Sequence, residues 1–179
     1  GNSPYNVVVV HGGPGAPGSV SLVANKLSIQ FGVLEPFQTK RTIKSQIEEL
    51  KNIIKKMGRP PVILIGHSWG AWLSYLFAAK NKEYVQKLIL VGSGPFEHSY
   101  VSQMKAMRAN RLNNFEKKRL KEIQSNLLEK NVENKQEIFA EFGKIMSKID
   151  SYDPIDIRPE IIEFQPEIYN SIMKEAKKL

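Results

Sequence analysis

The chain has 179 residues, of which 41% are hydrophobic, so it can form one sizeable core with a small lid and is not a disordered chain. It has no cysteine, which excludes a thiol nucleophile, thiolate metal sites and disulfides. No signal peptide is visible, and no apolar run approaches the roughly 20 residues that span a bilayer. We therefore expect a cytoplasmic protein that does not lie in the membrane. The net charge of +8 does not indicate nucleic-acid binding, because Lys51, Lys55 and Lys56 have the spacing of a solvated helix face without interleaved aromatic residues.

The first predicted element is a strand at residues 6–10. Its β-branched run, Val7-Val8-Val9-Val10, is typical of a parallel strand buried on both faces. The run leads directly into the glycine-rich segment His11-Gly12-Gly13-Pro14-Gly15. A backbone without side chains can approach a reacting oxygen closely, so this segment can supply one N–H donor of an oxyanion hole. We predict Gly13 as that donor, with Gly12 as the second choice.

The same segment could instead cradle a phosphate. Gly13, Gly15 and Gly18 have the Gly-x-Gly-x-x-Gly spacing of a dinucleotide-binding loop. Pro14 and Pro17, however, remove amide donors where a pyrophosphate would need them. A nucleotide-binding module stays an alternative, which a thermal-shift screen against nucleotides would reveal.

Helix and strand patterns then alternate as far as residue 91. The predicted elements are a helix at 19–30, a short strand at 32–35, a helix at 42–57, a strand at 62–66, a helix to about residue 80 and a strand at 88–91. The helix at 42–57 places five apolar side chains on one face: Ile43, Ile47, Leu50, Ile54 and Met57. This alternation predicts an α/β fold with a doubly wound, mostly parallel sheet and with sites at the carboxyl ends of its strands.

The segment Gly66-His67-Ser68-Trp69-Gly70 lies between a strand pattern and a helix pattern. A Gly-x-Ser-x-Gly segment in that position is a nucleophile elbow, a tight turn that holds its serine in strained backbone geometry. Only small residues fit two positions before and after the serine. We therefore predict Ser68 as the nucleophile, facing a cleft shared with Gly13, and the backbone N–H of Trp69 as the second oxyanion donor.

Together these two motifs resemble the α/β-hydrolase superfamily, and within it the branch of the proline iminopeptidases. The resemblance covers residues 5–98 well and the rest of the chain only in general character. The family usually carries an Asp-x-Arg-Gly-x-Gly-x-Ser segment after the second strand. Here residues 34–41 read Leu-Glu-Pro-Phe-Gln-Thr-Lys-Arg, so a supporting loop has been rebuilt or shortened.

Strand patterns end after residue 98. Helical segments rich in Glu, Lys and Asn are predicted near 99–112, 114–131, 133–149 and 165–178. We divide the chain into an α/β-hydrolase core, residues 1–98, and a helical lid, residues 99–179. The lid is expected to cover the carboxyl edge of the sheet above Ser68, where the family commonly places one.

A catalytic serine needs a histidine base that a carboxylate orients. In the family this pair follows the serine and the lid, but no strand-like run follows residue 99, and His98 is the one histidine after Ser68. We expect His67 to point away from the site and His11 to brace the oxyanion loop. The triad acid and histidine are expected in a further C-terminal segment of roughly 60–90 residues, with His98 as the alternative base.

The sequence thus predicts a serine hydrolase that cleaves an ester, amide or peptide bond of a small molecule or short peptide through an acyl-serine intermediate. We expect it to need no metal or organic cofactor, and the 179 residues to be inactive by themselves. The alternative is an inactive or non-enzymatic relative that binds a small acyl ligand in the same cleft. Turnover of a p-nitrophenyl ester, with Ser68→Ala as the control, distinguishes the two.

Overall fold

The computed structural model describes residues 2–129, 133–153 and 163–178. These residues form two compact units. One unit contains the described residues up to Gly94 together with residues 163–178, and the other contains the described residues from Pro95 to Asp153. The last helix, α7 (Pro166–Ala176), therefore belongs to the same unit as the sheet, although it was expected as part of the lid, residues 99–179.

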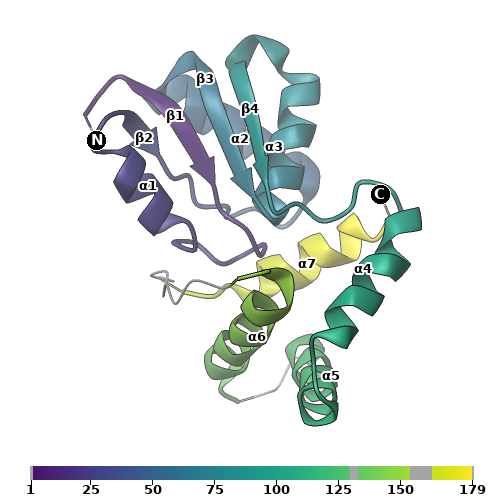
Figure 1. The fold of residues 1–179 in the computed structure, drawn as a ribbon. Coiled ribbons are helices and arrows are strands. Elements are labelled where there is room, and N and C mark those ends of the chain that lie inside the picture. The colour runs from purple at the N-terminus through teal and green to yellow at the C-terminus, as the bar shows by residue number, and fades with distance from the viewer. Residues whose placement is uncertain (1, 130–132, 154–162, 179) are drawn as a thin grey trace. The chain divides into compact units, whose positions relative to one another are not determined.

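The first unit is built on a parallel sheet in the order β2-β1-β3-β4 (Figure 1). Its strands are β1 (Tyr5–Val10), β2 (Gly32–Leu34), β3 (Gly58–His67) and β4 (Val85–Val91). Val10 pairs with Gly66, and Gly66 pairs with Leu90, so the ends of the three strands are in register. The glycine-rich segment after β1 and the serine turn after β3 consequently leave neighbouring strands at the same edge.

Side chains of β1 alternate between two hydrophobic layers. Val7 and Val9 pack with Val20 and Ala24 on the side of α1 (Ser21–Leu27). Val8 and Val10 pack in the larger cluster on the other side, with α2 (Ile43–Met57) and α3 (Trp69–Lys80). Helices thus cover both faces, and the prediction of a doubly wound parallel sheet is confirmed (Figure 1). A short 3₁₀ turn, η1 (Lys82–Tyr84), leads from α3 into β4.

Helix α2 has the predicted apolar stripe. Ile43, Ile47, Leu50 and Ile54 are all buried, and the Thr42 side chain caps the helix by accepting from the Ser45 N–H. Met57 was expected on this face but is 56% exposed, because the chain leaves the helix here and enters β3 at Gly58. The interior of the stripe was therefore predicted correctly, and its last member was not.

Helix α7 packs on the same core although it is far away in the sequence. Ile168 and Ile172 are buried in the cluster that contains α2 and α3. The Ile43 N–H, at the start of α2, donates to the Glu175 carboxylate at 2.9 Å, and Arg41 forms an ion pair with Glu167. A carboxylate at a helix N-terminus is a favourable contact, since the first amides of the helix have no partner within it.

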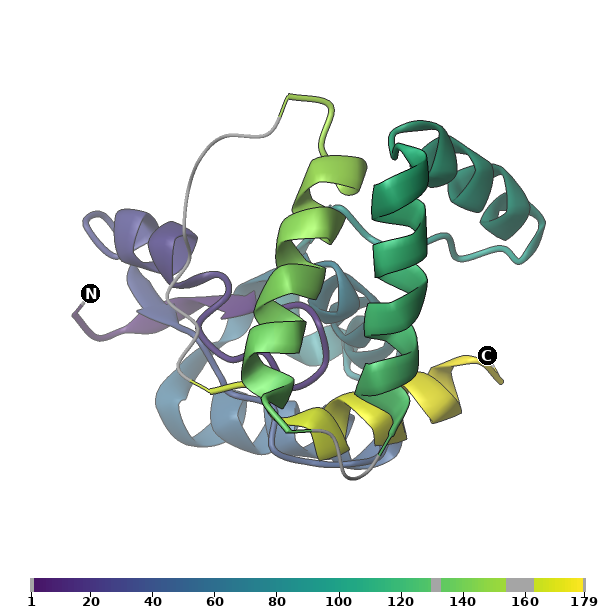
Figure 2. The same ribbon diagram turned by 90° about the horizontal axis from the view of Figure 1, so that it is seen from below.

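The second unit contains α4 (Ser99–Asn110), α5 (Asn114–Leu128) and α6 (Lys135–Asp150). Helices α5 and α6 lie side by side (Figure 2). A two-pronged ion pair of 2.7 and 2.6 Å joins Arg119 to Glu141. Asn113 and Glu116 form a capping box at the start of α5. Within the described residues after 98 the structure has helices and no strand, as the sequence predicted.

Candidate active site

Ser68 lies between the end of β3 and the first residue of α3. Its backbone angles are φ 53° and ψ −118°, a combination that side-chain-bearing residues rarely adopt. Such a conformation costs on the order of 1–3 kcal/mol and persists only where the surrounding structure imposes it. The predicted strained turn at a helix N-terminus is therefore confirmed.

Glycine is required on both sides of this turn. A Cβ atom on Gly66 would lie 2.3 Å from the Gly70 carbonyl oxygen. A Cβ atom on Gly70 would lie 2.2 Å from the Val10 carbonyl oxygen and 2.6 Å from that of His11. All three distances are far below van der Waals contact, and the atoms met belong to the backbone, which cannot move aside. The elbow therefore packs directly on the end of β1, where the glycine-rich segment begins.

The glycine-rich segment approaches the serine at Gly12. A Cβ atom on Gly12 would lie 2.8 Å from the Ser68 Cβ and 3.0 Å from the His67 carbonyl oxygen. Gly13 follows with φ 39°, and its carbonyl accepts from the Ala16 N–H at 2.8 Å in a turn. The amide of Trp69, in the first turn of α3, has no acceptor within the helix. The roles of Trp69 and Gly13 as oxyanion donors stay predictions.

A methyl group at Gly12 should damage this contact selectively. Gly12→Ala is expected to lower kcat of the full-length protein by about 10²–10³-fold, the loss caused by removing one oxyanion donor, because the loop must move away from Ser68. Steady-state ester hydrolysis and circular dichroism would measure the effect. Gly94→Ala is the matched control, since a Cβ there would meet only the Trp72 Nε1, at the ordinary van der Waals distance of 3.5 Å. A Gly12→Ala enzyme with unchanged kcat would contradict the proposed approach of the loop.

His11 is completely buried and braces the glycine-rich segment. Its Nδ1–H donates to the Gly12 carbonyl at 3.0 Å, and its Nε2 accepts from the Gln38 N–H at 3.2 Å. Burial lowers the pKa of His11, so the ring stays neutral at pH 7. Both ring nitrogens are occupied by these contacts, which fits the predicted brace and not a catalytic base.

Trp69 is anchored through its side chain as well. Its indole Nε1–H donates to the Gln46 Oε1 at 3.0 Å, and the Gln46 Nε2 donates to the Lys40 carbonyl at 2.9 Å. Gln46 was not predicted from the sequence as part of the site. A signal for it exists, because Gln46 lies three residues after Ile43 and four before Leu50, on the apolar stripe of α2, where a polar side chain needs a buried partner.

Gly15 fixes the far end of the segment to the residue before α7. The Gln165 N–H donates to the Gly15 carbonyl at 2.8 Å, and a Cβ atom on Gly15 would lie 2.4 Å from the Gln165 carbonyl oxygen. The space beside Gly15 is thus filled by the chain itself. This packing gives the dinucleotide-loop interpretation no support.

Glu35, directly after β2, supports the same loop. Burial raises the pKa of Glu35, while hydrogen bonds from the Gly18 and Val20 amides act in the opposite direction. Its Oε1 is buried and has no hydrogen-bond partner within the described part of the chain. The carboxylate therefore both holds the loop and carries an uncompensated burial cost when it is charged.

This cost predicts a pH dependence of stability. The pKa of Glu35 in the folded protein lies above the usual 4.5, so the folded state favours the protonated carboxyl. The stabilisation that results is fully present below pH 4.5 and is lost as the pH rises through the folded pKa. Glu35→Gln removes the titration. The difference in melting temperature, variant minus wild type, should grow with pH and then level off. A difference that stays constant over the range of roughly pH 4–8 would contradict the burial argument.

The other two histidines have different environments. His67 is exposed at the end of β3, and its Nδ1 would lie 3.2 Å from a Cβ on Gly12, so its ring lies beside the glycine-rich segment and the expectation that it points away from the site is not borne out. His98 is the N-cap residue of α4 and belongs to the second unit. The structure brings His11, Gly12, Ser68 and Trp69 together within the first unit, and the role of His98 stays a prediction.

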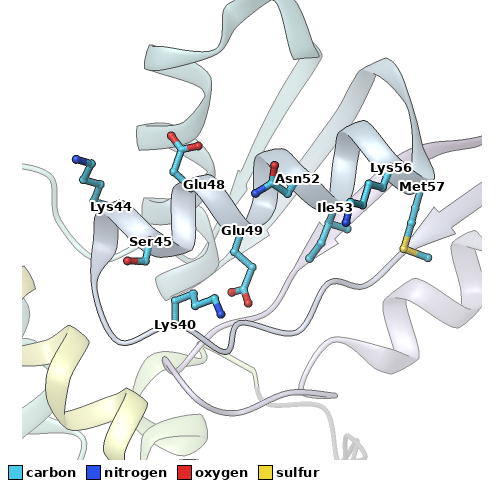
Figure 3. A pocket seen from close by; sticks show the side chains of 9 residues that line it. All are labelled: Lys40, Lys44, Ser45, Glu48, Glu49, Asn52, Ile53, Lys56 and Met57. Atoms are coloured by element: carbon cyan, nitrogen blue, oxygen red, sulfur yellow. The ribbon is translucent and has the colours of Figure 1, made fainter.

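A surface pocket away from this turn lies along α2 (Figure 3). Its lining mixes charges of both signs, from Lys40, Lys44, Lys56, Glu48 and Glu49, and includes neither Ser68 nor Trp69. Glu49 already accepts from the Thr39 N–H at 2.9 Å. In the described residues, no three His, Cys, Asp or Glu side chains are placed to hold a metal ion, and no helix is long and apolar enough to cross a membrane.

Comparisons with known proteins point to one family. A family model described as alpha/beta hydrolase fold matches residues 35–142. The uncharacterized protein YqjL of Bacillus subtilis (strain 168) is 34% identical over 55 residues, which are 30% of this chain and 22% of that protein.

Among solved structures, VinJ is similar with a TM-score of 0.58 and 19% identity, over 97% of this chain and 60% of that one. A structure from work on carboxylesterases of Nitrososphaera gargenis is similar with a TM-score of 0.52 and 15% identity, over 96% and 63%. At these identities the likeness shows the fold alone. The chain spans about 60% of the length of these solved structures.

Proposed function

Because this chain belongs to the α/β-hydrolase fold family, we propose that it is the nucleophile-bearing part of a serine hydrolase. The observation that carries the proposal is the backbone of Ser68, held at φ 53° before α3 with Gly12 packed against its Cβ position. A fold maintains such strain where a side chain must be presented in one orientation. The proposed reaction is the hydrolysis of an ester, amide or peptide bond.

In this mechanism the Ser68 Oγ attacks the carbonyl carbon of the substrate and gives its proton to a base. The carbonyl oxygen becomes negative in the tetrahedral intermediate and accepts from the N–H groups of Trp69 and Gly13. The base then protonates the leaving group, which departs and leaves the acyl group on Ser68. Water, deprotonated by the same base, attacks the acyl carbon; the bond to the Ser68 Oγ then breaks, the acid is released, and the base gives its proton to the Oγ.

The base and its carboxylate are proposed to lie outside these 179 residues. His11 is buried and bound at both ring nitrogens, so it cannot accept the serine proton. The solved relatives are longer than this chain, which leaves room in the whole protein for both groups. His98 is the alternative base, and its exchange for alanine tests it directly.

The substrate assignment is also a proposal. We assign a small-molecule ester or a short peptide, in keeping with the proline iminopeptidase-like motifs, and place the enzyme in the cytoplasm. The helices α4 to α6 are proposed to act as the lid that shapes the substrate pocket. None of these steps uses a metal or organic cofactor.

Covalent labelling tests the nucleophile. The full-length protein is treated with a fluorophosphonate probe, digested and examined by mass spectrometry. We expect an adduct on the peptide that contains Ser68 and none in Ser68→Ala. A folded protein that hydrolyses no ester and takes no label at Ser68 would contradict the proposal and favour a non-catalytic acyl-binding protein.

A further inference from the structure

Two buried glutamines, Gln38 and Gln46, each hold one side of the proposed oxyanion hole. Gln38 is 4% exposed and Gln46 is 1% exposed, unusually low values for this residue type. A buried amide is costly unless it is hydrogen-bonded, so the partners of these two side chains indicate their purpose. The side-chain amide of Gln38 donates to His11 in the glycine-rich segment, and the side-chain oxygen of Gln46 accepts from Trp69, so each contacts one of the two segments that supply the proposed oxyanion donors.

Gln38 holds the glycine-rich segment from two directions. Its backbone N–H donates to the His11 Nε2 at 3.2 Å, and its side-chain Nε2 donates to the His11 carbonyl at 2.8 Å. His11 in turn donates to the Gly12 carbonyl, whose following amide is that of Gly13. The position of the first donor therefore depends on Gln38 through a single residue.

Gln46 holds the other donor. Its Oε1 accepts from the indole of Trp69, the residue whose backbone N–H is the second proposed donor. Trp69 is 7% exposed, and a buried indole N–H needs an acceptor. This contact restrains the side chain of Trp69 and, through it, the first turn of α3.

The two glutamines are also connected to each other. The Gln46 Nε2 donates to the carbonyl of Lys40, two residues after Gln38, at 2.9 Å. Both side chains line one small cavity of about 10 Å³, together with Val10 and Leu73 from the strand and the helix that they restrain. Residues 38–46 thus tie both donor segments to one short piece of chain.

We propose that Gln38 and Gln46 are positioning residues that set the spacing of the two oxyanion donors. This inference rests on the proposed function and adds to it the residues that prepare the site. Neither side chain needs to touch the substrate.

A positioning role has a distinct kinetic consequence. Donors in an oxyanion hole act on charge that develops in the transition state, so their displacement lowers kcat and leaves KM nearly unchanged. Displacing a catalytic group by about 1 Å can cost on the order of 10²-fold. A tetrahedral boronate on Ser68 imitates the same charge and should lose affinity in parallel with kcat.

The test uses Gln38→Leu and Gln46→Leu in the full-length protein, assayed with a p-nitrophenyl ester and with phenylboronic acid as inhibitor. Each is expected to lower kcat by roughly 10–100-fold with KM within about threefold, and to weaken boronate inhibition by a similar factor. Asn52→Leu, on the exposed side of α2, is the matched control and should change none of these values.

Gln46→Glu is the second variant, for the case that Gln46→Leu does not fold. A protonated glutamic acid can accept from Trp69 and donate to Lys40, whereas the carboxylate cannot donate, so kcat relative to wild type should rise as pH falls. Unchanged kcat in folded Gln38→Leu and Gln46→Leu, or a relative kcat of Gln46→Glu that does not vary with pH, would overturn the inference. Full turnover by Ser68→Ala would instead refute the proposed function, so the two failures are distinguishable.

Discussion

Replacing Ser68 with alanine in the full-length protein is expected to lower ester turnover by about 10⁶-fold, the loss seen when a serine nucleophile is removed from a triad. The remaining activity, roughly 10³–10⁴-fold above the reaction in water, would come from the oxyanion hole and from binding. The loss should appear in kcat, because Ser68 forms its bond in the transition state. Initial rates with a p-nitrophenyl ester, corrected for spontaneous hydrolysis, measure it.

Ser74→Ala is the control for this experiment. Ser74 lies on the same helix, α3, and its Oγ is buried with no hydrogen-bond partner in the described parts of the chain. Removing such a hydroxyl costs little stability, so turnover should stay at the wild-type level. If Ser68→Ala kept activity within about tenfold of wild type, Ser68 could not be the nucleophile.

The sequence was most informative where structure depends on neighbouring residues. The spacing of apolar residues and the local composition predicted the four parallel strands and the helices between them. The Gly-x-Ser-x-Gly pattern predicted the strained φ of Ser68, and at Gly66 the steric reason lies within the turn, because a Cβ there would meet the Gly70 carbonyl, whereas Gly70 must be glycine because the end of β1 lies against it. A pattern that encodes a steric requirement can be read without the rest of the fold.

Contacts between distant segments could not be predicted in this way. Gln46 accepts a hydrogen bond from Trp69, 23 residues further along the chain. The Glu175 carboxylate accepts from the Ile43 N–H at the start of α2, 132 residues earlier. Nothing local distinguishes Gln46 from the other polar residues of α2 except its place on the apolar stripe. The packing of α7 on the sheet unit could not be predicted for the same reason. Its apolar face shows that the helix packs against something, but not against which surface.

In the glycine-rich segment, the sequence predicted one feature of the motif and left another undecided. Its composition predicted a close approach to the reacting serine, and the structure places Gly12 at that contact. The choice between the amides of Gly12 and Gly13 depends on the φ angle of each residue and on the brace from His11 and Gln38. Those angles follow from tertiary contacts, so the donor itself stays a prediction.

The second large effect concerns the 179 residues expressed alone, which we expect to show no Ser68-dependent ester turnover. Without a base, Ser68 keeps the pKa of an ordinary alcohol and is a poor nucleophile. His11 cannot serve as that base, because both of its ring nitrogens are bound. In addition, the edge strand β4 exposes its apolar end: Ile89, Leu90 and Val91 are 37%, 38% and 46% exposed. An exposed apolar edge strand also favours aggregation.

The experiment compares purified residues 1–179 with the full-length protein at equal concentration, after light scattering has confirmed that both are monodisperse. We expect fluorophosphonate labelling and ester turnover in the longer protein, and at most weak labelling in the shorter one. The shorter chain can still form the elbow and its braces, because all of their contacts lie within the first unit. Turnover by residues 1–179 that disappears in both Ser68→Ala and His98→Ala would disprove the prediction and make His98 the base.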